Sequence, residues 1–307
     1  MKKVVISIIL IIVIIAIILL VIFLNNKPKT VVEETFYITN DAIYEKTGKI
    51  NVNGIKANLE KINSVFKNNL ENMNVYFTII PDKTYYLENK LDTEFKEIKN
   101  NVQENLNPNI EFFDISNKLS LEDYYRTDMH WKQENLGEVI ETIRNELDLK
   151  REDINYEQKT LGEFYGTYYK EIESNISPDE LIYLANNNIE NCTVYVEETK
   201  TNEKVYSIEK YEESGNKYDI FLSGASAIEI ITNNNADTDK KLIMFRDSFG
   251  SSLAPLLIND YKEIVLIDLR YVNYSILENY IDFSNYDNQD VLFIYSSRVI
   301  NRSGIFR

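Results

Sequence analysis

The first hydrophobic pattern in the chain is an almost unbroken run of Ile, Val and Leu from Val4 to Leu24. A helix rises about 1.5 Å per residue, so about 20 apolar residues span the roughly 30 Å hydrocarbon core of a membrane. Lysines precede the run, and an Asn-Asn-Lys-Pro segment without a small-residue cleavage site follows it. We therefore expect residues 1–24 to form an uncleaved, single-pass transmembrane signal anchor and residues 25–34 to form a linker.

Beyond the linker, segments of helical periodicity alternate with short apolar segments. Apolar residues at three- and four-residue spacing indicate amphipathic helices, whereas brief β-branched and aromatic runs indicate buried strands. The expected helices are Ile55–Leu70, Phe95–Leu106 and Leu136–Leu147, and the expected strands are Val75–Ile80, Ile110–Ile115, Leu242–Phe245, Ile264–Ile267 and Val291–Tyr295. This alternation predicts an α/β protein with a three-layer α/β/α sheet over residues 35–307.

The stretch 151–239 departs from this pattern. It is polar and rich in Asn and Glu, and it holds only strand-like pieces such as Cys192–Val196. We interpret it as an elaboration within the same domain, with a small separate domain as the alternative.

The charge of the chain narrows the classes of ligand. Among 307 residues, 49 are Asp or Glu and 33 are Lys or Arg, which gives a formal net charge of −16. A nucleic-acid binder needs a basic face to neutralise phosphates, so nucleic acid is not expected as a partner. The same acidity disfavours an anionic polymer as substrate, unless local cations such as Arg246 line the groove.

Two rare residue types limit the chemistry further. The chain contains one cysteine, Cys192, and one histidine, His130. An intrachain disulfide, a multi-cysteine zinc site and a multi-histidine metal site are therefore excluded, and we expect neither a metal nor a cofactor. If imidazole chemistry takes place in this protein, His130 must perform it.

The segment Tyr125–Trp131, with the sequence YRTDMHW, places a carboxylate two residues before that imidazole. On a loop that enters a helix, Asp128 can accept the Nδ1–H of His130, fix its tautomer and stabilise the imidazolium formed during proton transfer. The alternative is that Asp128 caps the helix and His130 packs beneath Trp131.

The segment Arg246–Ser252, with the sequence RDSFGSS, follows an apolar strand and precedes a short helical pattern. A serine on such a turn lies at the carboxyl end of the sheet, where open α/β sheets bind their ligands. The alternative is that Asp247 and Ser248 only cap the helix. Taken together, the two segments offer a nucleophile and the base that it needs.

Four segments resemble a known group of proteins. Thr127–Trp131 resembles the TD-x-HW motif of the SGNH-hydrolase-like alginate O-acetylation proteins and of the DHHW family of Gram-positive bacteria. Ile80–Lys83 is similar to their PDK segment, Arg246–Gly250 to their GDS serine block, and Val265–Tyr271 to the strand after that block. The resemblance covers roughly residues 75 to 300.

This resemblance implies an SGNH-hydrolase-like sheet with Ser248 as nucleophile, His130 as general base and Asp128 as the acid that orients the base. Two positions depart from the pattern, because Met129 replaces one His of a DHHW string and Arg246 replaces the Gly of GDS.

Further site residues are expected around the serine. The backbone N–H of Ser248, at a helix N-terminus, is the first candidate for an oxyanion donor. Gly250, which allows a close backbone approach, and Gly224, in a Ser-Gly-Ala-Ser loop, are further candidates. Arg246 and Trp131 are candidate substrate contacts.

The function expected from these observations is that of an extracytoplasmic serine acyltransferase anchored in the cell membrane. The resemblance implies O-acetylation of a cell-envelope polysaccharide or exopolysaccharide, with a multi-pass membrane O-acyltransferase as the donor partner. Two alternatives remain open, a carbohydrate acetyl-esterase of the same fold and a non-catalytic protein that binds glycans or assembles the envelope.

Overall fold

The computed structural model describes residues 35–307 except 47, 88–91, 150–153 and 173. The expected anchor at 1–24 and the expected linker at 25–34 lie outside this range. Among the described residues, no helix combines the length and the apolar character needed to cross a membrane.

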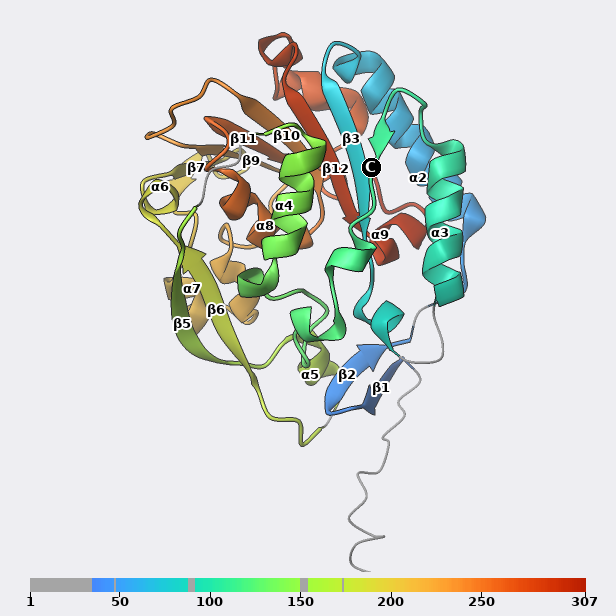
Figure 1. Cartoon of the computed structure of the whole chain (residues 1–307), viewed down its shortest axis with the longest axis vertical. Coiled ribbons are helices and arrows are strands. Elements are labelled where there is room, and N and C mark those ends of the chain that lie inside the picture. Colours follow the sequence, from blue (N-terminus) through green and yellow to red (C-terminus); the bar gives the residue numbers. More distant parts are fainter. Residues whose placement is uncertain (1–34, 47, 88–91, 150–153, 173) are drawn as a thin grey trace, which may run out of the picture.

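An eight-stranded sheet forms the centre of the molecule, in the order β4-β3-β12-β10-β11-β9-β7-β8 (Figure 1). The neighbours from β4 to β11 pair in parallel, and β9, β7 and β8 continue the sheet through antiparallel pairs. In chain order the strands are β3 (Asn74–Ile80), β4 (Glu111–Phe112), β7 (Thr193–Val196), β8 (Thr201–Glu203), β9 (Ile228–Thr232), β10 (Lys241–Arg246), β11 (Glu263–Ile267) and β12 (Asp290–Ser296).

Helices cover both faces of this sheet. Successive side chains of a strand point to opposite faces, so each buried strand packs against helices on both sides. On β10, Leu242 and Met244 join a buried apolar cluster on one face, which includes α4 (Gly137–Glu146) and α8 (Phe249–Leu257). Ile243 and Phe245 join a second cluster on the other face, which includes α2 (Val52–Val65), α3 (Asp92–Asn105) and α9 (Ser297–Asn301). The predicted mixed α/β fold with a central sheet is confirmed.

The polar stretch 151–239 contributes to the sheet at one edge. Its second half supplies β7, β8 and β9. Its first half forms a hairpin of β5 (Glu157–Phe164) and β6 (Asp179–Ala185), with α5 (Thr167–Glu171) in the connection between them. The remaining helices, α6 (Asn187–Glu190) and α7 (Glu209–Glu213), are short, and a further hairpin of β1 (Phe36–Thr39) and β2 (Ala42–Glu45) precedes α2.

One predicted strand is much shorter than expected. Only Glu111 and Phe112 of the run Ile110–Ile115 pair with β3. The chain turns immediately afterwards, because Asp114 Oδ1 accepts a hydrogen bond from the Ser116 backbone N–H (2.8 Å) and a 3₁₀ turn follows.

Candidate active site

Ser248 lies on the turn between β10 and α8, where its side chain is partly exposed. The preceding residue fixes this turn. The buried Asp247 carboxylate accepts hydrogen bonds from the backbone N–H groups of Phe249 (3.1 Å) and of Ser296 (2.7 Å), at the end of β12. Asp247 thus ties the turn to the neighbouring strand and holds Ser248 at the carboxyl edge of the sheet.

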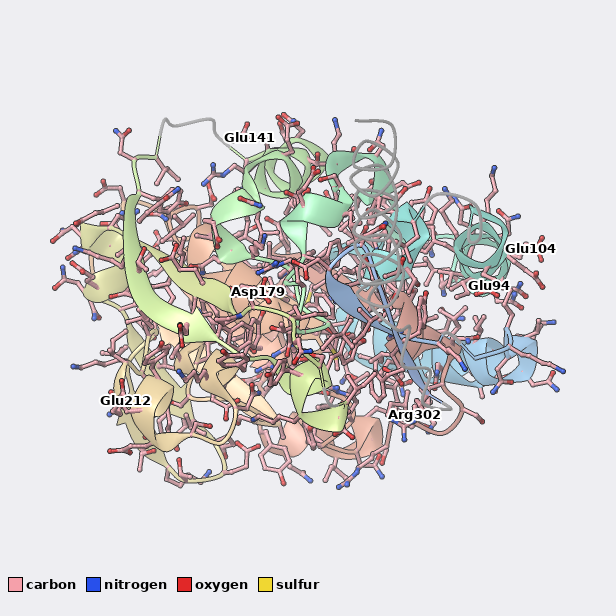
Figure 2. The ribbon with its side chains drawn as sticks, turned by 90° about the horizontal axis from the view of Figure 1, so that it is seen from below. Glu94, Glu104, Glu141, Asp179, Glu212 and Arg302 are labelled. Atoms are coloured by element: carbon pink, nitrogen blue, oxygen red, sulfur yellow. The ribbon has the colours of Figure 1, made fainter. Side chains whose placement is uncertain are left out.

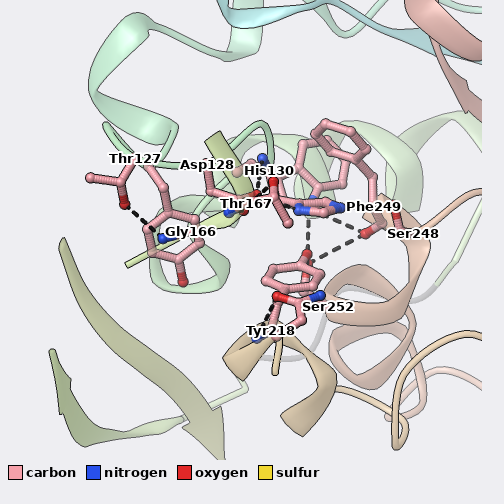
Figure 3. A network of polar contacts seen from close by, with 12 residues as sticks. Thr127, Asp128, His130, Gly166, Thr167, Tyr218, Ser248, Phe249 and Ser252 are labelled. Carbon is pink, nitrogen blue, oxygen red and sulfur yellow. Dashed lines mark hydrogen bonds and ion pairs between the residues drawn. The ribbon is translucent and has the colours of Figure 1, made fainter. Parts of the chain in front are cut away.

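His130 approaches Ser248 from the loop that precedes α4, and Figure 3 shows the resulting chain of polar contacts. His130 Nε2 lies 2.7 Å from Ser248 Oγ, and His130 Nδ1 lies 2.6 Å from Asp128 Oδ1. The same Asp128 oxygen accepts the His130 backbone N–H (2.9 Å). The structure therefore brings together the three residues expected from the sequence, with Asp128 bonded to the imidazole instead of capping α4, whose N-cap is Leu136.

The Asp128 carboxylate is fully buried and has partners on both oxygens. Its Oδ2 accepts hydrogen bonds from Thr167, through the backbone N–H (2.6 Å) and Oγ1 (2.9 Å). Burial alone would raise the pKa of Asp128, but the nearby His130 and these hydrogen bonds hold that pKa well below its ordinary value. Asp128 is therefore ionised and suited to stabilise a charged imidazole.

Aromatic rings fix the orientation of the His130 ring. Tyr218 stacks on it with ring centroids 4.0 Å apart and an interplanar angle of 12°, and the Phe249 centroid lies at 4.8 Å. The Tyr218 hydroxyl donates to Ser252 Oγ (2.8 Å), which also accepts Trp131 Nε1–H (2.9 Å). Trp131 is completely buried, so the expectation that it contacts substrate is wrong; it supports the imidazole instead.

Two charged residues hold the loop that carries Asp128. The buried Lys83 amine donates to the backbone carbonyls of Asp128 (2.7 Å) and Tyr125 (2.9 Å). Burial lowers the pKa of Lys83 to about 8, against the opposing effect of Asp128. Asp179 accepts the Thr127 backbone N–H (2.8 Å) and hydroxyl (2.6 Å), and Figure 2 shows Asp179 in the interior, whereas the acids labelled on α3, α4 and α7 lie at the periphery.

The expected oxyanion donors differ in how their N–H groups are used. The Ser248 N–H donates to no acceptor in the part of the chain that the structure describes. The Gly250 N–H donates to the Asp247 carbonyl (3.0 Å), and a Cβ on Gly250 would come within 2.6 Å of Arg246 Cβ. The Gly224 N–H donates to the Phe221 carbonyl (3.3 Å). Ser248 alone of the three therefore offers a free N–H, and Gly250 serves packing against Arg246.

Arg246 does not reach the substrate side of the turn, so the expectation of a substrate contact is wrong. Its side chain is buried, and Nη2 pairs with Glu229 Oε2 on β9 at 2.5 Å. Burial raises the pKa of Glu229 to about 7, against the opposing charge of Arg246. The pair binds the antiparallel extension of the sheet to β10.

Ser248 opens into a cleft of about 660 Å³. Its walls include residues that follow the ends of four parallel strands, namely Asp82 after β3, Ser248 after β10, Arg270 after β11 and Ser297 after β12. Met129, between Asp128 and His130, also lines it. The cleft therefore occupies the edge of the sheet at which α/β folds bind ligands.

Sequence reasoning missed several residues that build this site. Thr167, Tyr218 and Asp179 lie in the polar stretch 151–239, where no local pattern distinguishes them. Lys83 belongs to the PDK segment, but the sequence does not indicate that its amine is buried and holds the Asp128 loop.

Gly166, directly before α5, has less space for a Cβ atom than any other glycine that the structure describes. A Cβ there would come within 2.3 Å of Asp128 Cβ and 2.6 Å of the Thr127 carbonyl oxygen. We expect Gly166→Ala to displace Asp128, to lower the kcat/KM for ester cleavage by about 10- to 100-fold, and to destabilise the fold by about 1–3 kcal/mol. Gly215→Ala is the matched control, since a Cβ there meets no atom within 4 Å. Equal kcat/KM values in the two variants would contradict this role of Gly166.

Glu134, in the turn before α4, should make the free energy of unfolding depend on pH. Its Oε2 has no hydrogen-bond partner among the described residues, and burial raises its pKa from 4.5 to about 7. The folded protein thus binds more protons than the unfolded chain between these values, so stability falls as pH rises through this window. We expect Glu134→Gln to raise Tm at pH 8 and to leave it nearly unchanged at pH 4. An equal shift at both values in thermal unfolding would refute the assignment.

Comparisons with known proteins agree with the predicted resemblance at the level of fold. A scan of protein-family models and a search of curated proteins found no match. Among solved structures, a DHHW family protein from Eubacterium siraeum has a TM-score of 0.72 at 19% identity, covering 90% of this chain and 95% of that one. Bacillus cereus PatB1, in a structure with a sulfonyl adduct, has a TM-score of 0.67 at 17% identity, covering 88% and 97%. The O-acetyltransferase domain of Pseudomonas putida AlgJ matches with a TM-score of 0.49 at 12% identity, covering 85% and 90%.

Proposed function

We propose that the protein is a serine acyltransferase that acetylates hydroxyl groups of a glycan. The observation that carries the proposal is the hydrogen-bonded chain Ser248–His130–Asp128, with His130 Nε2 2.7 Å from a serine oxygen on the wall of a cleft. These three residues supply what activates a serine: a nucleophile, a base within hydrogen-bond reach of it, and a buried carboxylate that orients the base.

In the first half-reaction, His130 Nε2 takes the proton of Ser248 Oγ while that oxygen attacks the acetyl carbonyl carbon of the donor. The developing oxyanion is stabilised by the free Ser248 N–H and by the N-terminal end of α8. Collapse of the tetrahedral intermediate breaks the bond to the leaving oxygen, which takes the proton from His130. The product is acetyl-Ser248.

In the second half-reaction, His130 accepts a proton from the acceptor hydroxyl, whose oxygen attacks the acetyl-serine. The ester bond to Ser248 breaks, and Oγ regains its proton. A glycan hydroxyl as acceptor gives O-acetylation, whereas water gives ester hydrolysis through the same intermediate. The cleft of about 660 Å³ supports a glycan acceptor, since it can hold sugar residues beside Ser248.

The proposed setting is the outer face of the cell membrane. The apolar run Val4–Leu24 would anchor the chain and leave residues 35–307 outside the cell. The acceptor would then be an envelope polysaccharide or exopolysaccharide. A multi-pass membrane O-acyltransferase would supply the acetyl groups.

A deletion strain tests this function. We expect O-acetyl signals in NMR spectra of its envelope glycans to be lost, to return with the wild-type chain, and to stay absent with Ser248→Ala. If Ser248→Ala restores these signals fully, the protein acts without acyl chemistry, as expected of a glycan-binding or assembly protein.

A further inference from the structure

We propose that Lys46, Lys49 and Arg302 form a binding site for anionic groups of the acceptor, at the rim of the Ser248 cleft. The ligand class is a carboxylate or phosphate carried by a polymer. This inference rests on the proposed function for its place in catalysis, but the binding itself is independent of the chemistry.

The charges on the cleft wall are not all available to a ligand. Arg298 pairs with Asp82, and its Nη1 lies 2.6 Å from Glu45 Oε2, so this cation is neutralised by two acids. Arg270 is held by Asp268, with Nη2 2.6 Å from Oδ2. The Asp247 carboxylate is occupied by backbone N–H groups, as described above. Most of the inner wall is therefore internally compensated.

The rim differs, because its cations are exposed and uncompensated. Lys46, Lys49 and Arg302 line the cleft. None of them has a side-chain hydrogen bond or ion pair within the described parts of the chain. In Figure 2, Arg302 lies at the edge of the molecule. Glu94 is the one remaining acid on the wall among the described residues, so the three exposed cations outnumber it.

The two segments that carry these cations are joined. Asn301 Oδ1 accepts the Asn51 backbone N–H (2.7 Å), and Asn301 Nδ2 donates to the Lys49 carbonyl (3.3 Å). Arg302 directly follows Asn301, so its backbone is fixed relative to Lys49. The rim cations are consequently carried by two segments that hydrogen bonds of Asn301 link to each other.

This group stands out against the charge of the whole chain, which is −16. A polyanion is repelled by such a surface except where cations concentrate, so the rim would direct it to the cleft that holds Ser248. Each exposed charge pair contributes little by itself, but a polymer with repeated charges engages several pairs at once. The contact with an anionic substrate that was expected of Arg246 is thus assigned to Lys46, Lys49 and Arg302.

Direct binding tests the site without acyl chemistry. The full-length Ser248→Ala protein in detergent is titrated with fluorescein-labelled hexamers of galacturonic acid, of glycerol phosphate and of neutral galactose. We expect the anionic hexamers to bind more tightly than the neutral one. In the triple variant Lys46→Gln/Lys49→Gln/Arg302→Gln, the ratio of anionic to neutral affinity should fall about tenfold. Each exposed charge pair is expected to raise the affinity roughly two- to fivefold. The two anionic arms distinguish carboxylate from phosphate.

A matched control separates the site from net charge. Lys56→Gln/Lys67→Gln/Lys204→Gln removes three exposed lysines that do not line the cleft, and it should retain the preference. Equal affinity for anionic and neutral hexamers, or an equal loss in rim and control variants, would overturn the proposal. If binding follows the rim but Ser248→Ala restores the O-acetyl signals of the deletion strain, the proposed function fails and the anion site stands.

Discussion

Replacing Ser248 by Ala is expected to lower acetyl transfer from an aryl acetate by about 10⁴-fold or more, and His130→Ala is expected to cause a similar loss. The reason is that Ser248 Oγ and His130 Nε2, 2.7 Å apart, act in the same proton transfer. A serine without its base is a weak nucleophile at neutral pH, and the base without its serine has no group to activate. Release of the phenol chromophore measures the rate.

The double variant gives a sharper test of this coupling. If the two residues act as a unit, Ser248→Ala/His130→Ala should be no slower than either single variant. Ser64→Ala, on α2 and away from the cleft wall, should retain the wild-type rate. Losses that multiply in the double variant would show that the two side chains act independently.

Replacing Lys83 by Met is expected to lower kcat about 100-fold while the protein remains folded. The Lys83 amine donates to the carbonyls of Tyr125, Arg126 and Asp128, and its cation lies 5.0 Å from the ring centroid of Tyr44. Met fills a similar volume but donates no hydrogen bond, so the carbonyls of Tyr125 and Asp128 lose the Lys83 donor, whereas that of Arg126 keeps the Ile43 N–H (2.8 Å). A displaced Asp128 then misorients His130, and such misplacement costs about 100-fold in rate. Circular dichroism and the rate of ester cleavage measure the two effects.

Lys241→Met is the matched control for this substitution. Lys241 also lies over an aromatic ring, 4.8 Å from the Tyr286 centroid, but it stands at the opposite end of β10 from Ser248. It should retain the wild-type kcat. A Lys83→Met protein with wild-type kcat would show that the loop holds Asp128 without the amine.

Much of the fold was predictable because its signals are local. Each of the runs 242–245, 264–267 and 291–295 is a buried parallel strand, since strands covered on both faces are apolar throughout. The pairing of the Asp128 loop with the Ser248 turn was also predictable, because a single imidazole left one candidate base for the serine. The antiparallel strands β7 to β9, which extend the sheet as far as the β8 edge, were harder to predict, since antiparallel strands can carry polar residues on exposed positions.

The roles of individual side chains depended on partners far away in sequence. Arg246 was expected to contact substrate, but Glu229 on β9 pairs with it. Trp131 was expected to do the same, but it packs against Phe249 and donates a hydrogen bond to Ser252. The cleft cations without an acidic partner among the described residues, at 46, 49 and 302, come from segments with no motif of their own. Burial and pairing are properties of the assembled sheet, so sequence spacing alone does not determine them.

The central claim is that His130 activates Ser248 as a nucleophile. The most direct measurement is mass spectrometry of the full-length protein after treatment with phenylmethylsulfonyl fluoride, in which the serine oxygen bonds to sulfur and fluoride leaves. The account predicts a single sulfonyl adduct on the Ser248 peptide, absent from Ser248→Ala and formed far more slowly in His130→Ala. Equal labelling of Ser248 in the wild type and in His130→Ala, or no labelling of Ser248 at all, would contradict it.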